Sequence, residues 1–211
     1  MTYEEAAALP CAGVTAWNAL NSGERRLVPG SIVLVQGTGG VSSLAAQLAH
    51  AAGCRVIALS SSAAKMTELL RLGVVHPGDW VNYRENPHWG EAVRALTPAG
   101  RGVDVVVEVV GMSSINESLI ATRRRGVISV VGHLDGTPKD PFSLHEVLMK
   151  RLHIVGVHVG PRRDFEDMLQ LMAVKEVHPI LDDKRFTLPQ LKEAYAYLKS
   201  QKHSGKIVVT V

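Results

Sequence analysis

Residues 31–52 read SIVLVQGTGGVSSLAAQLAHAA, and this stretch decides the fold. A short apolar run at 32–35 leads into the glycine-rich turn GTGGVS at 37–42, which passes directly into a helical pattern. Glycines let a backbone turn tightly and approach a pyrophosphate, whose charge is met by the free N–H groups of the helix start. The stretch therefore predicts a strand, a phosphate-binding turn and a helix, as in proteins that hold a dinucleotide.

Apolar runs alternate with helical periodicity along most of the chain. Strands are expected at 32–35, 56–59, 103–109, 127–131 and 154–159, and helices at 41–52, 63–72, 89–96, 115–122, 144–150, 163–173 and from Pro189 to about Lys199. The expected strands are almost continuous in Val and Ile, which is typical of parallel strands buried on both faces. The pattern predicts an α/β fold: a Rossmann-type doubly wound parallel sheet of about six strands with flanking helices. A C-terminal helix and a strand at 206–211 follow it.

Composition limits the classes of protein that the 211 residues can form. Residues 1–30 are expected to be a connecting helical segment, 31–185 the nucleotide-binding domain, and 186–211 a C-terminal helix and strand. Aromatic residues make up only 5% and the net charge is +3, so nucleic acid is not an expected partner. No apolar run approaches the ~18 residues that span a bilayer, and two cysteines are too few for a disulfide framework. We expect a reduced, cytoplasmic protein that does not bind a membrane.

The end of the second strand indicates which nicotinamide cofactor is preferred. An acidic residue about 20 positions after the glycine turn would bind the adenosine ribose and favour NAD. Residues 59–65 read LSSSAAK and contain no carboxylate. Hydroxyls and an ammonium would accept a 2′-phosphate, so NADP(H) is favoured over NAD(H). Alternatively, Ser61 or Ser62 only caps the helix that carries Lys65.

Five short motifs, in this order along the chain, resemble the medium-chain dehydrogenase/reductase superfamily. They are LPCAGVTAW at 9–17, VLVQ at 33–36, EVVG at 108–111, VGH at 131–133 and SGKIV at 204–208. The resemblance is nearest to the zinc-type alcohol dehydrogenase and quinone-reductase-like members. It implies hydride transfer to or from an enone, quinone or carbonyl/alcohol substrate. It also implies a truncated form, because nothing here corresponds to the amino-terminal GroES-like barrel of those relatives, to which their last segment returns.

Where the motifs match, the resemblance implies a cofactor channel at the carboxyl ends of the strands. Its expected residues are Thr15 near the nicotinamide; Gly37, Gly39, Gly40 and Val41 at the pyrophosphate; Ser61, Ser62, Lys65 and Tyr83 at the adenosine phosphate; Val110, Gly111, Gly132, His133 and Leu134 along the ribose and nicotinamide; and Val159 and Gly160 at the carboxamide. Two of these keep an alternative. Tyr83 could serve packing alone, and His133 could contribute only its backbone rather than relay a proton.

The resemblance also bears on metal binding and assembly. Cys11 matches a position that ligates catalytic zinc in zinc-dependent relatives, but its partner ligands there come from the barrel. We therefore expect no zinc, and expect Cys11 to be a small buried residue. No catalytic acid or base is identified. The strand near 152–160 is expected at the sheet edge, where two copies would pair into a homodimer.

Two other functions remain open from the sequence. The chain could bind the cofactor as a scaffolding module without redox turnover. It could also be a non-redox enzyme, such as a lyase, isomerase or cyclase, that reuses the exposed cleft. A fold alone does not decide between these chemistries.

Overall fold

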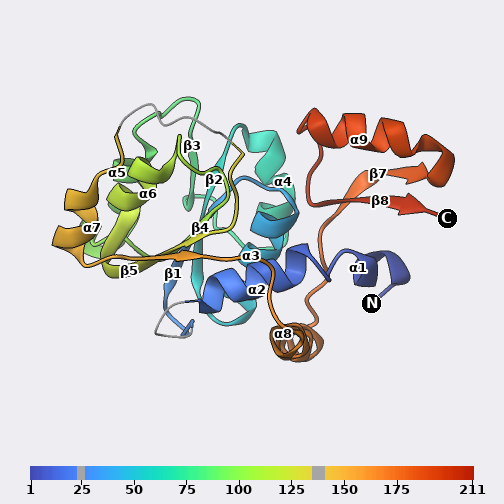
Figure 1. The fold of residues 1–211 in the computed structure, drawn as a ribbon, viewed down its shortest axis with the longest axis horizontal. Helices are drawn as coiled ribbons and strands as arrows, with labels where there is room; N and C mark the ends of the chain where they lie inside the picture. The colour runs from blue at the N-terminus through green and yellow to red at the C-terminus, as the bar shows by residue number, and fades with distance from the viewer. Residues whose placement is uncertain (23–26, 135–140) are drawn as a thin grey trace.

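A parallel sheet of six strands forms the centre of the computed structural model, which describes residues 1–22, 27–134 and 141–211 (Figure 1). Its strands are β1 (Ile32–Gln36), β2 (Arg55–Ser60), β3 (Trp80–Asn82), β4 (Val103–Glu108), β5 (Thr122–Val130) and β6 (His153–Gly156). They lie in the order β3-β2-β1-β4-β5-β6. The chain thus reverses direction across the sheet between β1 and β4, which makes their carboxyl ends the topological switch point. The predicted doubly wound sheet of about six strands is confirmed.

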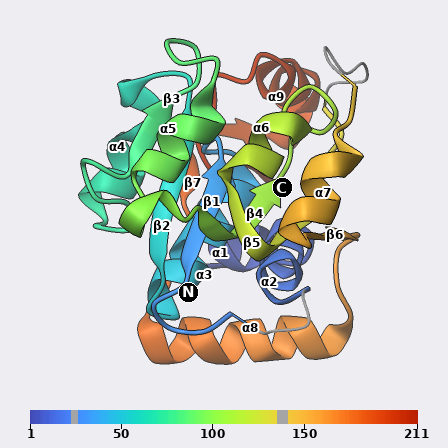
Figure 2. The same cartoon turned by 90° about the vertical axis from the view of Figure 1, so that its left-hand side faces the viewer.

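Helices cover both faces of this sheet, and α8 runs past one end of it in Figure 2. One face carries α2 (Ala12–Asn21), α3 (Gly40–Ala51), α4 (Ala63–Arg71) and α8 (Arg162–Lys175), and the other carries α5 (Trp89–Ala95), α6 (Ile115–Ala121) and α7 (Leu144–Lys150). Each face of the sheet has its own hydrophobic core. Along β1, Val33 and Val35 belong to the core shared with α2 and α3, while Ile32 and Leu34 belong to the core shared with α5 and α6. Both faces of the strand are therefore buried, which explains why its sequence is continuously apolar.

A second, two-stranded sheet lies at the far end of the molecule from α7 (Figure 1). In it, β7 (Leu181–Thr187) and β8 (Lys206–Thr210) pair in parallel beside α9 (Leu191–Lys199). The predicted terminal helix and strand are confirmed. The expected boundary between 185 and 186 falls inside β7, which pairs with β8 and not with the main sheet.

Several element ends differ from those expected. The sequence missed β3, which has only three residues, and β7, whose sequence LDDKRFT places four charged residues between its apolar ones. The strand expected to end at 159 ends at Gly156, although β6 does lie at the sheet edge. The remaining elements are α1 (Tyr3–Ala7) and short 3-10 turns at Pro98–Gly100 and Leu188–Gln190. Among the described residues, no helix has the length and apolarity required to cross a membrane.

Candidate cofactor site

The glycine turn between β1 and α3 leaves backbone N–H groups open. Gly37 has φ +77°, a left-handed conformation that glycine adopts without strain, and its N–H donates to the carbonyl of Leu59 at 2.8 Å. Gly39 is the N-cap of α3, and no side chain caps the helix there. A Cβ at Gly37 or Gly39 would point into open space. The first turn of α3 thus presents N–H groups and a positive helix end in the way that a pyrophosphate requires.

The C-terminal segment closes over this turn, a contact that the sequence pattern did not predict. The Gly205 N–H donates to the carbonyl of Thr38 at 2.9 Å, and Gly39 and Gly205 form an isolated β-bridge. The aliphatic stem of Lys206 lies against Gly40, where a Cβ would collide with it. Lys206 therefore brings a cation beside the amino-terminal end of α3. The motif around it was quoted only for its family resemblance, and its place beside the turn follows from tertiary structure alone.

The predicted adenosine-phosphate residues gather at the ends of β2 and β3. Ser62 is the N-cap of α4, but its side chain makes no capping hydrogen bond. The Lys65 ammonium donates to the carbonyl of Gln201 at 2.8 Å, which connects α4 to the C-terminal loop. The N–H of Tyr83 donates to the carbonyl of Ser60 at 3.2 Å, and its side chain is 41% exposed. Tyr83 is thus available to a ligand on this edge rather than packed in the core.

The loops after β4 and β5 are built against one another. The N–H of Leu134 donates to the carbonyl of Val110 at 2.9 Å, and a Cβ at Gly132 would overlap the carbonyl of Val109. Gly111 has φ +102°, so the turn needs a glycine at that position. The predicted residues of both loops therefore lie together at the carboxyl ends of β4 and β5. His133 is exposed there.

Helix α2 meets the segment after β6 at the remaining side of the site. Thr15 is buried, and its hydroxyl donates to the carbonyl of Cys11 at 2.7 Å. Asn18, one turn further on, donates from Nδ2 to the carbonyl of Val159 at 2.7 Å. A Cβ at Gly160 would come within 2.9 Å of Val14 Cγ2, so the close approach of the two segments requires glycine. Asn18 is a site residue that the sequence did not single out.

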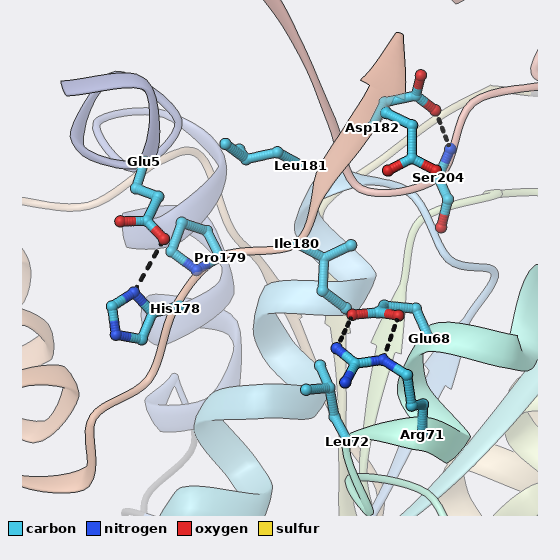
Figure 3. Close-up of a pocket in the computed structure, with 11 residues that line it drawn as sticks. Glu5, Glu68, Arg71, Leu72, His178, Pro179, Ile180, Leu181, Asp182 and Ser204 are labelled. Atoms are coloured by element: carbon cyan, nitrogen blue, oxygen red, sulfur yellow. Dashed lines mark hydrogen bonds and ion pairs between the residues drawn. The ribbon is translucent and has the colours of Figure 1, made fainter. Parts of the chain in front are cut away.

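A separate cavity lies away from these residues. Its volume is about 550 Å³, and it opens between α1, α4 and the segment leading into β7 (Figure 3). Four of its charged or titratable side chains pair with each other: Glu5 contacts His178 at 2.9 Å, and Arg71 donates to Glu68 at 2.6 Å. The Arg71 guanidinium holds the pKa of the Glu68 carboxyl below its usual value. The cavity is also lined by Asp182 and Asp183, whose carboxylates would repel a phosphate, so we place the candidate site at the glycine turn and not in this cavity.

The expected position of Cys11 is wrong. Its side chain is exposed, because Cys11 stands at the N-cap of α2, outside the buried stripe of that helix. Within the residues that the structure describes, no group of three or more His, Cys, Asp or Glu side chains could hold a metal ion. The absence of zinc stays a prediction.

Known proteins resemble this chain over its whole length. Residues 40–174 match the family described as zinc-binding dehydrogenase. The zinc-type alcohol dehydrogenase-like protein C1773.06c of Schizosaccharomyces pombe is 40% identical, over 100% of this chain and 61% of its own length. A solved NAD-dependent alcohol dehydrogenase is 29% identical, with TM-score 0.84, over 100% of this chain and 60% of that one. The 2-octenoyl-CoA carboxylase reductase CinF, solved with NADP and 2-octenoyl-CoA, is 27% identical, with TM-score 0.86, over 100% of this chain and 50% of that one.

The chain spans about 60% of the length of the zinc-type alcohol dehydrogenase-like relatives that it matches. The solved structures named above share the fold of this chain over all of its length. Since the family match covers more than half of its residues, and the full length aligns with the yeast protein at 40% identity, this chain belongs to the zinc-binding dehydrogenase family of the medium-chain dehydrogenase/reductase superfamily.

Proposed function

We propose that this chain is the cofactor-binding part of an NADP(H)-dependent oxidoreductase. The observation that carries the proposal is the uncapped start of α3, with Gly39 facing open space and Lys206 lying over Gly40. Backbone N–H groups, a helix dipole and an ammonium together form a site for a pyrophosphate. The bound cofactor would supply the hydride, and the residues of this chain would bind and orient it.

Preference for NADP(H) is supported by the chemistry at the end of β2. Ser61, Ser62 and Lys65 offer hydroxyls and one ammonium, and no carboxylate stands at 59–65 to repel a 2′-phosphate. Among the relatives, CinF was solved with NADP whereas the alcohol dehydrogenase is described as NAD-dependent. The family therefore contains both kinds, and the residues of β2 and α4 favour the phosphorylated one here.

The acceptor class is a carbonyl, a quinone or an enone, including an enoyl thioester. Relatives described as an aldehyde reductase from Synechocystis and an acryloyl-coenzyme A reductase from Metallosphaera sedula support this range. All three acceptors carry an electron-poor carbon that can receive a hydride. The channel formed by the loops after β4, β5 and β6 would hold the nicotinamide in a fixed orientation towards that carbon.

A titration of the purified chain with NADPH and with NADH, by calorimetry, tests the proposal. We expect saturable binding of both with NADPH at least about tenfold tighter, which corresponds to about 1.4 kcal/mol. The Gly39→Asp variant, which puts a carboxylate at the pyrophosphate, should abolish binding of both. If the wild-type chain binds neither nucleotide, the oxidoreductase proposal is wrong. Binding without NADPH oxidation by any enone, quinone or aldehyde would instead support a cofactor-binding module.

We also propose that the protein is a homodimer through the edge strand β6. Ile154 on β6 is 37% exposed, and the adjacent α7 exposes Leu144, Leu148 and Met149. An unpaired edge beside exposed apolar side chains is a surface that a second copy can cover by continuing the sheet.

A further inference from the structure

Glu108 and Gln36 form a buried polar pair at the switch point of the sheet. Glu108 is the last residue of β4 and is 0% exposed; Gln36 is the last residue of β1 and is 5% exposed. Nε2 of Gln36 donates to Oε2 of Glu108 at 2.7 Å. The two side chains thus connect the two strands whose carboxyl ends flank the point where the order of the sheet reverses.

The carboxylate of Glu108 accepts hydrogen bonds from five groups. Oε1 accepts from the N–H groups of Val110 and Gly111 at 3.0 and 2.9 Å. It also accepts from the Ser114 hydroxyl at 2.6 Å, while Oε2 accepts from Ser118 at 2.5 Å in addition to Gln36. Every partner can act as a donor, which suits an acceptor-only carboxylate. The turn that leaves β4 is therefore folded back onto the side chain that precedes it.

The amide of Gln36 completes the arrangement from the other side. Its Oε1 accepts from the N–H groups of Val109 and Val110 at 3.0 and 3.3 Å. The N–H of Val131 in turn donates to the backbone carbonyl of Glu108 at 2.9 Å. The two side chains thus fix the turn at 109–111 directly, and the neighbouring loop at 131–134 is attached to that turn by backbone bonds to the carbonyls of Glu108 and Val110. These are the two segments that wall the proposed channel.

Folding alone does not call for a carboxylate at this position. Burying a charged group has a large desolvation cost, and an apolar pair of similar volume often gives equal or greater stability. A fully satisfied polar network does have another effect, since it allows only one arrangement of the backbone around it. The chemistry of the pair therefore points to control of loop geometry.

We propose that Glu108 and Gln36 are positioning residues that hold the loops after β4 and β5 in the conformation that receives the nicotinamide half of the cofactor. The proposal rests on the proposed function. Neither side chain has to touch the cofactor; the pair acts through the backbone of 109–111 and 131–134. What matters is complementarity, with one side chain that only accepts facing one that both donates and accepts.

Exchanging the two groups tests this complementarity. In E108Q an amide nitrogen would face the amide nitrogen of Gln36, and rotating either amide turns a donor towards a backbone N–H. In Q36E two carboxylates would meet. The double variant Q36E/E108Q restores an acceptor opposite every donor. We expect each single variant to weaken NADPH binding at least about tenfold, and the double variant to return to within about threefold of wild type.

A matched control separates positioning from general destabilisation. Asp104 lies on the same strand at its amino-terminal end, and its carboxylate accepts from the N–H of Ile32 at 2.8 Å and from Arg101 at 2.8 Å. D104N should lower the free energy of unfolding and leave the dissociation constant of NADPH unchanged. Should E108Q fail to fold, Ser114→Ala removes only one donor to Oε1 and is expected to weaken binding by about threefold.

Amide hydrogen exchange in the free protein distinguishes failure of the positioning role from failure of the proposed function. Faster exchange at 109–111 in E108Q, reversed in the double variant, is expected whether or not a cofactor is added. If wild type binds no nucleotide, the proposed function fails together with the role of the pair in it. If wild type binds but E108Q behaves like D104N, or the double variant does not recover, the positioning role is wrong and the proposed function stands.

Discussion

Asn18 and Val159 lie 141 residues apart in the chain and are joined by a 2.7 Å hydrogen bond from Nδ2 of the first to the carbonyl of the second. Val159 has φ +56°, a left-handed conformation that is unfavourable for a β-branched residue. Such strain persists only where the surroundings hold it in place, and it is concentrated at functional sites. The side-chain amide of Asn18 on α2 thus holds a strained turn beside the position expected for the nicotinamide carboxamide.

Replacing Asn18 with leucine should therefore release this turn. We expect the free energy of unfolding to fall by about 1 kcal/mol and NADPH affinity to fall several-fold. Asn21→Ala is the control, because Asn21 donates from the same helix to the local carbonyl of Trp17. Calorimetry and urea denaturation measure the two quantities. An unchanged affinity in Asn18→Leu would mean that the turn does not shape the cofactor site.

Cofactor preference should depend on the charge at the end of β2. Ser61→Asp places a carboxylate where the 2′-phosphate is expected, so it should reverse the order of NADPH and NADH affinity. Lys65→Ala should weaken NADPH by about tenfold and leave NADH nearly unchanged, because it removes one charge-assisted contact. The ratio of the two dissociation constants is the measurement. An equal loss of affinity for both nucleotides would mean that Lys65 acts through its hydrogen bond to Gln201 and not by binding the 2′-phosphate.

Charge on the edge strand should prevent the proposed dimer. Ile154→Lys adds a cation on β6, and we expect it to convert a dimer to a monomer in light scattering after size exclusion. Val174, which is 78% exposed near the end of α8, provides the control through Val174→Lys. A wild-type monomer at high concentration, or a dimer that survives Ile154→Lys, would exclude this interface.

The two cysteines should differ sharply in reactivity. Burial raises the pKa of the Cys54 thiol to about 11 from its ordinary 9.0, whereas Cys11 is exposed. One thiol per chain should therefore react quickly with an alkylating reagent at neutral pH, and Cys11→Ser should remove it. Mass spectrometry identifies the labelled residue. Rapid labelling of Cys54 in the native protein would contradict its burial.

The raised pKa of Cys54 also has a consequence for stability. Because the unfolded chain loses this proton first, the contribution to the free energy of unfolding is complete below about pH 9 and is lost as pH rises through about 11. Cys54→Ala lacks this titration. In urea denaturation, the free energy of unfolding of wild type should therefore fall relative to that of Cys54→Ala as pH rises across that interval.

Local patterns were enough to predict most of the fold. The run at 32–35 is apolar on every residue because β1 is buried on both faces, and the positive φ of Gly37 after it favours glycine. Sequence patterns did not predict elements that are very short or that mix charged and apolar residues. β3 has three residues, and the two buried residues of β7 are Asp182 and Phe186, one of which is charged.

The sequence predicted where the site residues lie along the strands, but not which residues they contact. Strand ends place the predicted residues at one edge of the sheet, because parallel strands all end there. Contacts such as Lys206 with Gly40, or Asn18 with Val159, join segments distant in the sequence, and periodicity carries no information about them. Glu108 appeared only as one letter of a motif, since its five hydrogen bonds exist only once the turn has closed.

The bond between Gly205 and Thr38 has a consequence for the order in which this protein is made. The glycine turn leaves the ribosome well before Gly205 and Lys206, which follow it in the sequence. Until that moment the nascent chain can form the sheet but lacks the contact that completes the turn. Full nucleotide affinity would then wait until residues 205 and 206 have been added, and a chain stopped before residue 205 would bind less tightly than one that contains them.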